Sequence, residues 1–165
     1  MQRNRYEGRA LVGAIFLGLG FGGFFDGIVF HHLLQWHHML SSVVPPDSME
    51  AMRTNMRWDG YFHAFSLLMV LLGTFIVYSA GRKRYPLPSS RWLSGWLIFG
   101  WGLFNLVEGI LNHHILQIHT VRYQNDVLGG EPSLAWALTF LILGGVGLML
   151  LGYAIARTST ARTQL

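Results

Sequence analysis

The sequence predicts an all-α fold, a polytopic membrane four-helix bundle made of two repeated helical hairpins. Three observations support this prediction. Of the 165 residues, 52% are hydrophobic and 12% are charged, whereas about a quarter are charged in ordinary soluble domains. Four apolar runs are each long enough to cross a bilayer, which takes about 20 helical residues. A histidine-rich motif occurs twice, once in the first run and once in the third.

The four runs define one transmembrane domain over residues 1–165. Helices are expected at about 11–40, 60–80, 92–120 and 133–156, so that 11–80 and 92–156 are the two halves of an internal repeat. All five prolines fall between the runs, where helices can stop or start. The first run follows a basic start, but it is too long for a signal peptide and shows no small-x-small cleavage site.

Lysine and arginine counts predict the orientation. Nine basic residues lie beside one set of helix ends, namely Arg3, Arg5, Arg9, Arg82, Lys83, Arg84, Arg91, Arg157 and Arg162, and three beside the other, namely Arg53, Arg57 and Arg122. The positive-inside rule then places both termini in the cytoplasm. In a bacterium this means a multi-pass inner (plasma) membrane protein whose loops 41–58 and 121–132 face the periplasm. The lipid bilayer is the expected partner; the basic residues form no single patch for nucleic acid, and a homo-oligomer is left open.

The repeat is specific. Residues 26–38 read DGIVFHHLLQWHH and residues 108–120 read EGILNHHILQIHT. Seven of the thirteen positions are identical at an offset of 82, three of them histidines, and Asp26 corresponds to Glu108. Two spans separate the copies, so the copies run the same way through the membrane. This predicts a parallel repeat about an axis along the membrane normal.

Ionisable side chains gather towards the outer helix ends. At about 100° per residue, Asp26, His31, His37 and His38 face the bundle centre, and the repeat places Glu108, His113 and His119 opposite them. The second span adds Asp59 and His63, which are spaced i, i+4 and so lie on one face of the helix. The fourth span has no such pair. The candidate metal ligands are therefore Asp26, His31, His37, His38, Asp59, His63, Glu108, His113 and His119. His32 and His114 point elsewhere and are weaker candidates.

Intramembrane ionisable groups are costly and point to function, although a single histidine can be a hydrogen-bonded packing residue. Three carboxylates and eight histidines at one depth exceed what packing requires and predict a transition-metal site. Cysteine is absent, which excludes thiolate ligands. We expect copper in preference to zinc or iron, because methionines in the loop 41–58 offer soft ligands, although an interfacial helix explains those methionines better. Haem held between His31 and His113 is the alternative cofactor.

The preferred function is copper handling or delivery at the periplasmic face, with periplasmic metal carriers or oxidase assembly factors as partners. A metal-dependent membrane enzyme, hydrolase or oxygenase, is the alternative, with a carboxylate acting as base beside a metal-bound water. A small bis-histidine haem protein is the third. The sequence shows no serine nucleophile motif, phosphate loop or nucleotide fingerprint, so no catalytic residue is assigned.

The segments DGIVFHHLLQWHH, WDGYFHAF and EGILNHHILQIH together resemble a family of bacterial four-span inner-membrane proteins known as a domain of unknown function. Their shared signature here is a repeated DG/EG-x3-HH-x2-Q-x-H motif. The resemblance covers nearly the whole chain. It implies a bacterial inner-membrane protein and carries no activity or ligand set with it.

Overall fold

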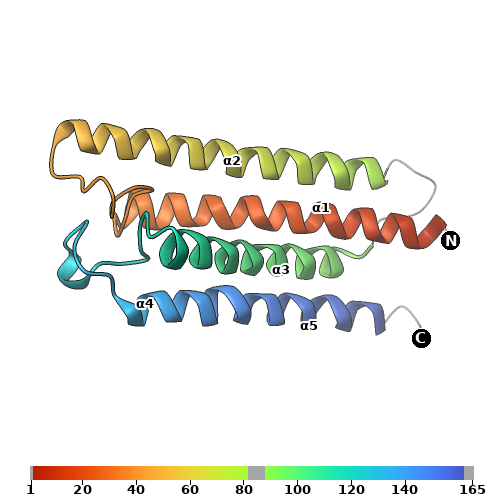
Figure 1. The fold of residues 1–165 in the computed structure, drawn as a ribbon. Helices are drawn as coiled ribbons and strands as arrows, with labels where there is room; N and C mark the ends of the chain where they lie inside the picture. Colours follow the sequence, from red (N-terminus) through yellow and green to blue (C-terminus); the bar gives the residue numbers. More distant parts are fainter. Residues whose placement is uncertain (1, 82–87, 162–165) are drawn as a thin grey trace.

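The computed structural model describes residues 2–81 and 88–161, which fold entirely into helices and connecting loops (Figure 1). Four segments are long and apolar enough to cross a membrane: Tyr6–Leu33, Met49–Gly81, Ser90–Ile115 and Leu134–Thr158. The predicted all-α membrane four-helix bundle is therefore confirmed. Its elements are α1 (Gln2–Phe25), η1 (Asp26–Leu33), α2 (Met49–Gly81), α3 (Ser90–Glu108), η2 (Gly109–Ile115), η3 (Gln124–Asp126), α4 (Leu134–Thr139), η4 (Phe140–Gly147) and α5 (Leu148–Ala161).

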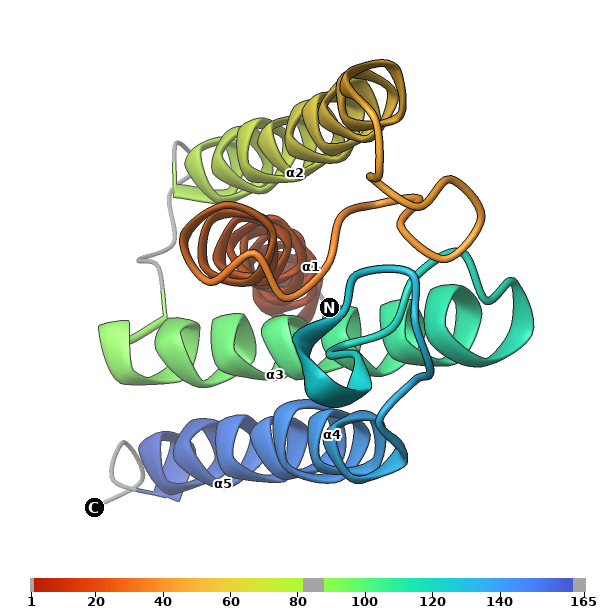
Figure 2. The same cartoon turned by 90° about the vertical axis from the view of Figure 1, so that its left-hand side faces the viewer.

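Helices α1 and α3 lie side by side at the centre, with α2 packed on α1 and α5 packed on α3 (Figures 1 and 2). Glycines permit the central contact. A Cβ on Gly18 would overlap the carbonyl oxygen of Leu97, and a Cβ on the equivalent Gly100 would overlap that of Ile15. Small residues let membrane helices approach closely, so this crossing depends on the absence of both side chains.

Both copies of the histidine motif end their helix in the same unusual way. Each passes into a π-helical segment, η1 or η2, and then breaks at a glutamine with positive φ, Gln35 at 50° and Gln117 at 51°. Left-handed backbone costs a residue with a side chain roughly 1–2 kcal/mol. The helices expected at 11–40 and 92–120 accordingly end at Leu33 and Ile115. The last histidines of each motif therefore lie on loops, where a count of 100° per residue does not apply.

The second membrane helix begins earlier than the expected 60–80, at Met49, and runs unbroken to Gly81. The Ser48 hydroxyl accepts a hydrogen bond from the Ala51 N–H, at 3.2 Å, as an N-cap does. The fourth runs from Leu134 to Ala161 through η4, against the expected 133–156. The start of α1 and the end of α5 lie at the end of the bundle opposite the loops that follow η1 and η2 (Figure 1). Four of the counted basic residues, Arg82, Lys83, Arg84 and Arg162, lie outside the described residues.

The outer helices also correspond to each other, α2 to the α4–η4–α5 segment, but at offsets smaller than the 82 residues of the histidine motif. Gly13 packs on Gly73 as its equivalent Gly95 packs on Gly152, and the two partners are 79 residues apart. Nearer the histidines, Gly27 faces Phe62 as Gly109 faces Phe140, and there the partners are 78 apart. The difference of one residue falls in the π-helical η4, because a π turn inserts one residue into an α-helix. At the offset of 78, Asp59 on α2 corresponds to Ala137 on α4.

Candidate metal centre

Four buried histidine rings form the centre of the site, two from each copy of the motif. His37 and His119 stack face to face, with ring centroids 4.8 Å apart and planes 12° apart. His31 meets His37 edge-on at 4.5 Å, and His113 meets His119 edge-on at 4.8 Å. The stacked pair thus lies between His31 and His113.

Reciprocal hydrogen bonds to the backbone orient the stacked pair. His37 donates from Nδ1 to the Val121 carbonyl oxygen at 2.8 Å, and His119 donates from Nδ1 to the Met39 carbonyl oxygen at 3.1 Å. Each acceptor belongs to the opposite copy and is the repeat equivalent of the other. A neutral ring that donates from Nδ1 keeps its lone pair on Nε2. In His37 this atom makes no hydrogen bond to the described residues, whereas His119 Nε2 hydrogen-bonds to Glu108 Oε1 at 2.9 Å. Burial also holds the pKa of His37 well below its usual value, so this ring is neutral at pH 7 and can bind a metal.

The first copy adds carboxylates around His31. The His31 Nδ1 donates to Asp59 Oδ1 at 2.7 Å, and its Nε2 lies 3.2 Å from Asp26 Oδ2. Asp59 also accepts from His38 Nδ1 at 2.8 Å and from the Met39 N–H at 2.8 Å. A carboxylate behind a histidine raises the basicity of the ring and fixes its orientation in metal sites. Asp59 therefore acts as an outer support for His31.

The second copy is less supported. Glu108 Oε1 lies 3.1 Å from His113 Nε2 and 2.9 Å from His119 Nε2. Within the described part of the chain, His113 Nδ1 is buried without a hydrogen-bond partner. The position that supplies Asp59 in the first copy holds Ala137 here, which offers no acceptor.

Buried polar atoms that make no hydrogen bond to the described residues converge at this centre. Within residues 2–81 and 88–161 they include both Asp26 carboxylate oxygens, Glu108 Oε2 and the Nε2 atoms of His31, His37 and His113. The carboxylates of Asp26, Asp59 and Glu108 have histidines as their ion-pair partners in the described structure. Buried charge requires a compensating charge. Protons on the histidines or a bound cation would supply it.

Two sets of three side chains bring their ligand atoms within 4.8 Å of one another: His31, His37 and His119, and Glu108, His113 and His119. Zinc and comparable ions bind imidazole nitrogen and carboxylate oxygen at about 2.0–2.2 Å. Small side-chain rotations therefore suffice to close either set around one ion. His119 belongs to both sets, and its Nδ1 is already bonded to the Met39 carbonyl oxygen. Its Nε2, which hydrogen-bonds to Glu108 Oε1 at 2.9 Å, is therefore the atom through which the two sets can share one ion.

The structure brings together six of the nine predicted ligands: Asp26, His31, His37, Glu108, His113 and His119. Two more, His38 and Asp59, pair with each other behind His31. The ninth, His63, donates from Nδ1 to its own helix at the Asp59 carbonyl oxygen and stacks on His32 with centroids 5.0 Å apart. His63 and His32 thus form a separate pair between α2 and η1, outside both three-residue sets.

The loops after each motif cover the cluster. The Ser42 N–H donates to the Ile118 carbonyl oxygen at 3.0 Å, and the hydroxyls of Ser41 and Tyr123 hydrogen-bond at 2.9 Å. Ser41 and Tyr123 are 82 residues apart, so this bond joins matching positions of the two copies of the motif. His31 and His37 have an exposed fraction of 0%. The site is therefore closed beneath the loops.

A family model described as "Predicted membrane protein (DUF2243)" matches residues 13–159. The chain belongs to this family. The match spans both copies of the motif, most of the first membrane segment and the other three in full. Neither the curated proteins nor the solved structures contain a match to the chain.

The sequence did not reveal several parts of the site. The acceptors for His37 and His119 are the backbone carbonyls of Val121 and Met39, and any residue type supplies a carbonyl. The Ser41–Tyr123 bond could not be predicted from matching residue types, because the two residues differ, although their spacing of 82 is that of the repeat. The assignment of Ala137 as counterpart of Asp59 required the inserted residue in η4, which leaves no mark in the sequence.

Proposed function

We propose that this membrane protein holds a transition-metal ion among Asp26, His31, His37, Glu108, His113 and His119, and that copper is the metal it handles. One observation carries the proposal: buried nitrogen and carboxylate atoms that make no hydrogen bond to the described residues face one another at the centre. Neutral imidazoles whose other nitrogen is already hydrogen-bonded are the usual form of metal-ligating histidine.

The donor set supports copper first. Imidazole suits copper, zinc, iron and nickel, and copper(II) binds most tightly among the divalent first-row ions. Zinc and iron are the alternatives at the same ligands. Haem is less favoured, because the stacked rings of His37 and His119 occupy the space between His31 and His113 that a macrocycle would need.

In the proposed role the protein lies in a bacterial inner membrane with both termini in the cytoplasm and the cluster at the periplasmic end. Handling of copper there includes exchange with periplasmic carriers or oxidase assembly factors. Release then requires the Ser41–Tyr123 cover to open.

A metal-dependent membrane enzyme, hydrolase or oxygenase, is the second candidate. Glu108 favours it, because this residue both contacts the histidines and lines an apolar groove open towards the lipid. A carboxylate in such a place can serve as a general base.

The deciding experiment is elemental analysis of protein purified after growth with copper, zinc and iron, with loading of each metal in vitro. We expect about one equivalent of copper, and loss of it in His31→Ala and in His113→Ala. His114→Ala is the matched control, since His114 is exposed. A preparation that neither contains nor takes up these metals overturns the proposal, and unchanged stoichiometry in either variant overturns the shared site.

The rate of metal loss to an excess of chelator separates the two roles. Rapid loss supports delivery, whereas retention over hours supports a resident, catalytic ion. An absorption spectrum tests the haem alternative, because a Soret band would show that the site holds haem and not a bare metal ion.

A further inference from the structure

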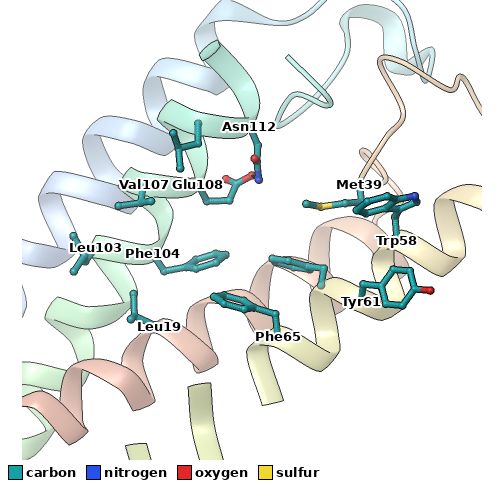
Figure 3. Close-up of a pocket in the computed structure, with 12 residues that line it drawn as sticks. Leu19, Met39, Trp58, Tyr61, Phe65, Leu103, Phe104, Val107, Glu108 and Asn112 are labelled. Atoms are coloured by element: carbon teal, nitrogen blue, oxygen red, sulfur yellow. Dashed lines mark hydrogen bonds between the residues drawn. The ribbon is translucent and has the colours of Figure 1, made fainter. Parts of the chain in front are cut away.

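A second pair of stacked histidine rings, the outer pair, lies beside the buried centre between η1 and α2. The rings of His32 and His63 have centroids 5.0 Å apart and planes 10° apart. The central rings of His37 and His119 stack with nearly the same geometry and bring ligand nitrogens within 4.8 Å of each other. Neither ring of the outer pair lines the apolar groove between α2 and α3 (Figure 3). The outer pair is therefore a separate cluster, and its ring spacing is that of the central pair.

His63 has the hydrogen bonding of a metal-ligating histidine. Its Nδ1 donates to the Asp59 carbonyl oxygen at 2.7 Å, so the neutral ring keeps its lone pair on Nε2. A Cβ on Gly27 in η1 would come within 2.7 Å of this Nε2. The glycine thus leaves the Nε2 edge uncovered by a side chain, next to the helical segment that carries His32. One nitrogen bonded to a backbone carbonyl and the other available is the usual state of a ligating ring.

The outer pair is accessible from outside the protein, unlike the centre. The His32 side chain is exposed and that of His63 is half-buried, whereas His31 and His37 have an exposed fraction of 0%. Imidazole nitrogen suits divalent copper and zinc. Two imidazoles with water at the remaining positions hold such an ion less tightly than the larger buried set of ligands does. The outer pair therefore suits an ion that arrives from solution and moves on.

Shared residues connect the outer pair to the centre. Asp59 accepts from His63 with its main-chain oxygen and from His31 with its carboxylate, at 2.7 Å in each case. Phe62, the neighbour of His63 in sequence, stacks on the His31 ring with centroids 5.4 Å apart. His32 directly follows His31 along η1. Each histidine of the outer pair is thus in contact with, or bonded to, a residue that touches a ligand of the buried centre.

The second half of the molecule has no counterpart of the outer pair. At the offset of 78, His63 corresponds to Leu141, which meets the glycine of its own copy as His63 does. His114, the counterpart of His32, is exposed and lies in a half that offers no second imidazole at this position. Asp59 is likewise confined to the first half. The outer pair and the carboxylate support of the centre therefore lie on the same side.

We propose that His32 and His63 form a loading site, which binds a divalent copper ion from solution and supplies it to the buried centre. The water ligands of the bound ion leave positions that incoming protein ligands can occupy. Supply to the centre rests on the proposed function, whereas binding by the outer pair does not.

Copper(II) alone is the probe for binding, with full-length protein in phosphatidylcholine nanodiscs. Electron paramagnetic resonance during a titration should show a tight class of copper and then a weaker class, whose pulsed signal carries the modulation of two imidazoles. His63→Leu, which introduces the residue of the second half, should remove the weaker class and retain the tight one. His32→Ala, at an exposed side chain, should do the same. His114→Ala is the matched control and should retain both classes.

Loss of the buried centre gives a different result from loss of the loading site. His113→Ala should lose the tight class and retain the weaker one. A weaker class that is absent from the unsubstituted protein, or that persists in both outer-pair variants, overturns the loading site and leaves the centre untouched.

The rate of loading tests the supply of copper to the centre. With copper below one equivalent, the tight class should fill several-fold more slowly in His32→Ala and in His63→Leu than in His114→Ala, and reach the same final occupancy. Equal rates in the three variants overturn the proposal, because the ion would then reach the centre without the outer pair.

Discussion

The two copies of the histidine motif share their backbone and differ in what surrounds their histidines. Both pass through a π-helical segment and a left-handed glutamine, and His37 and His119 each hydrogen-bond to a carbonyl of the opposite copy. Around these shared features, Asp59 supports His31 in the first copy, while His113 has no such carboxylate.

The difference separates two kinds of requirement. Features that bring the copies together are duplicated, because each copy must supply half of a symmetric contact. Features that shape the surroundings of the cluster have diverged. Asp59 on α2 corresponds to Ala137 on α4, and Phe30 in η1 corresponds to Asn112 in η2, beside an apolar groove. One duplicated scaffold thus carries one asymmetric site.

The largest expected effect comes from His119, which belongs to both three-residue sets. His119→Ala should weaken metal binding by more than the roughly 10–100-fold that outer-shell changes cause, because it removes the nitrogen that both sets share. Competition with a chelator of known affinity measures this loss. His114→Ala, at the exposed neighbouring histidine, should retain the affinity; a small effect of His119→Ala would place the ion elsewhere.

Asp59→Asn tests the support that only the first copy has. An amide cannot accept from His31, His38 and the Met39 N–H as a carboxylate does. We expect metal affinity to fall by about 10–100-fold, measured by the same competition. The control is Asp47→Asn, on the exposed loop. If both variants bind metal equally, Asp59 has a structural role and the asymmetry carries no consequence for the ion.

Substitutions at the contact between α1 and α3 should lower stability equally in the two copies, whereas substitutions around the metal centre should not have equal effects. Gly18→Ala and Gly100→Ala each place a Cβ against a backbone oxygen of the facing helix, and such overpacking costs roughly 1–3 kcal/mol. Thermal unfolding in detergent should show two similar decreases in stability. Gly60→Ala, whose Cβ would meet nothing within 4 Å, should be neutral or stabilising. Markedly unequal effects would show that the central contact has itself diverged.

Ala137→Asp is expected to have the smallest effect of these changes. It gives the second copy the carboxylate that Asp59 supplies in the first. A carboxylate at this position should approach His113 as Asp59 approaches His31, and raise metal affinity by up to about tenfold. Ala137→Ser, of similar size and without charge, serves as the comparison. An aspartate variant that folds but binds metal no better than the serine variant would argue against the equivalence of positions 59 and 137.

Much of the site could be predicted from sequence because intramembrane histidines and carboxylates are rare and their repetition at 82 residues is specific. A count of 100° per residue sets His31 about 140° from Asp26, and likewise His113 from Glu108. The π-helical turns η1 and η2 bring each pair together instead, at 3.2 Å and 3.1 Å. The role of His63 could not be predicted in this way: its spacing from Asp59 places both on one face, but its ring bonds to its own helix and stacks on His32. A pattern along one helix does not specify which neighbour lies beside it.

The sequence by itself determined the four membrane helices, the repeat and the residue types gathered at one depth. Hydrophobic length and motif identity are properties of the chain, and the bilayer makes them decisive. Only the tertiary structure decided which nitrogen of each histidine is free and which carboxylate stands behind which ring. It also decided that the offset between α2 and the fourth membrane helix changes by one residue within η4. These features depend on backbone carbonyls, a π turn and the packing of helices, and none of them has a residue type of its own.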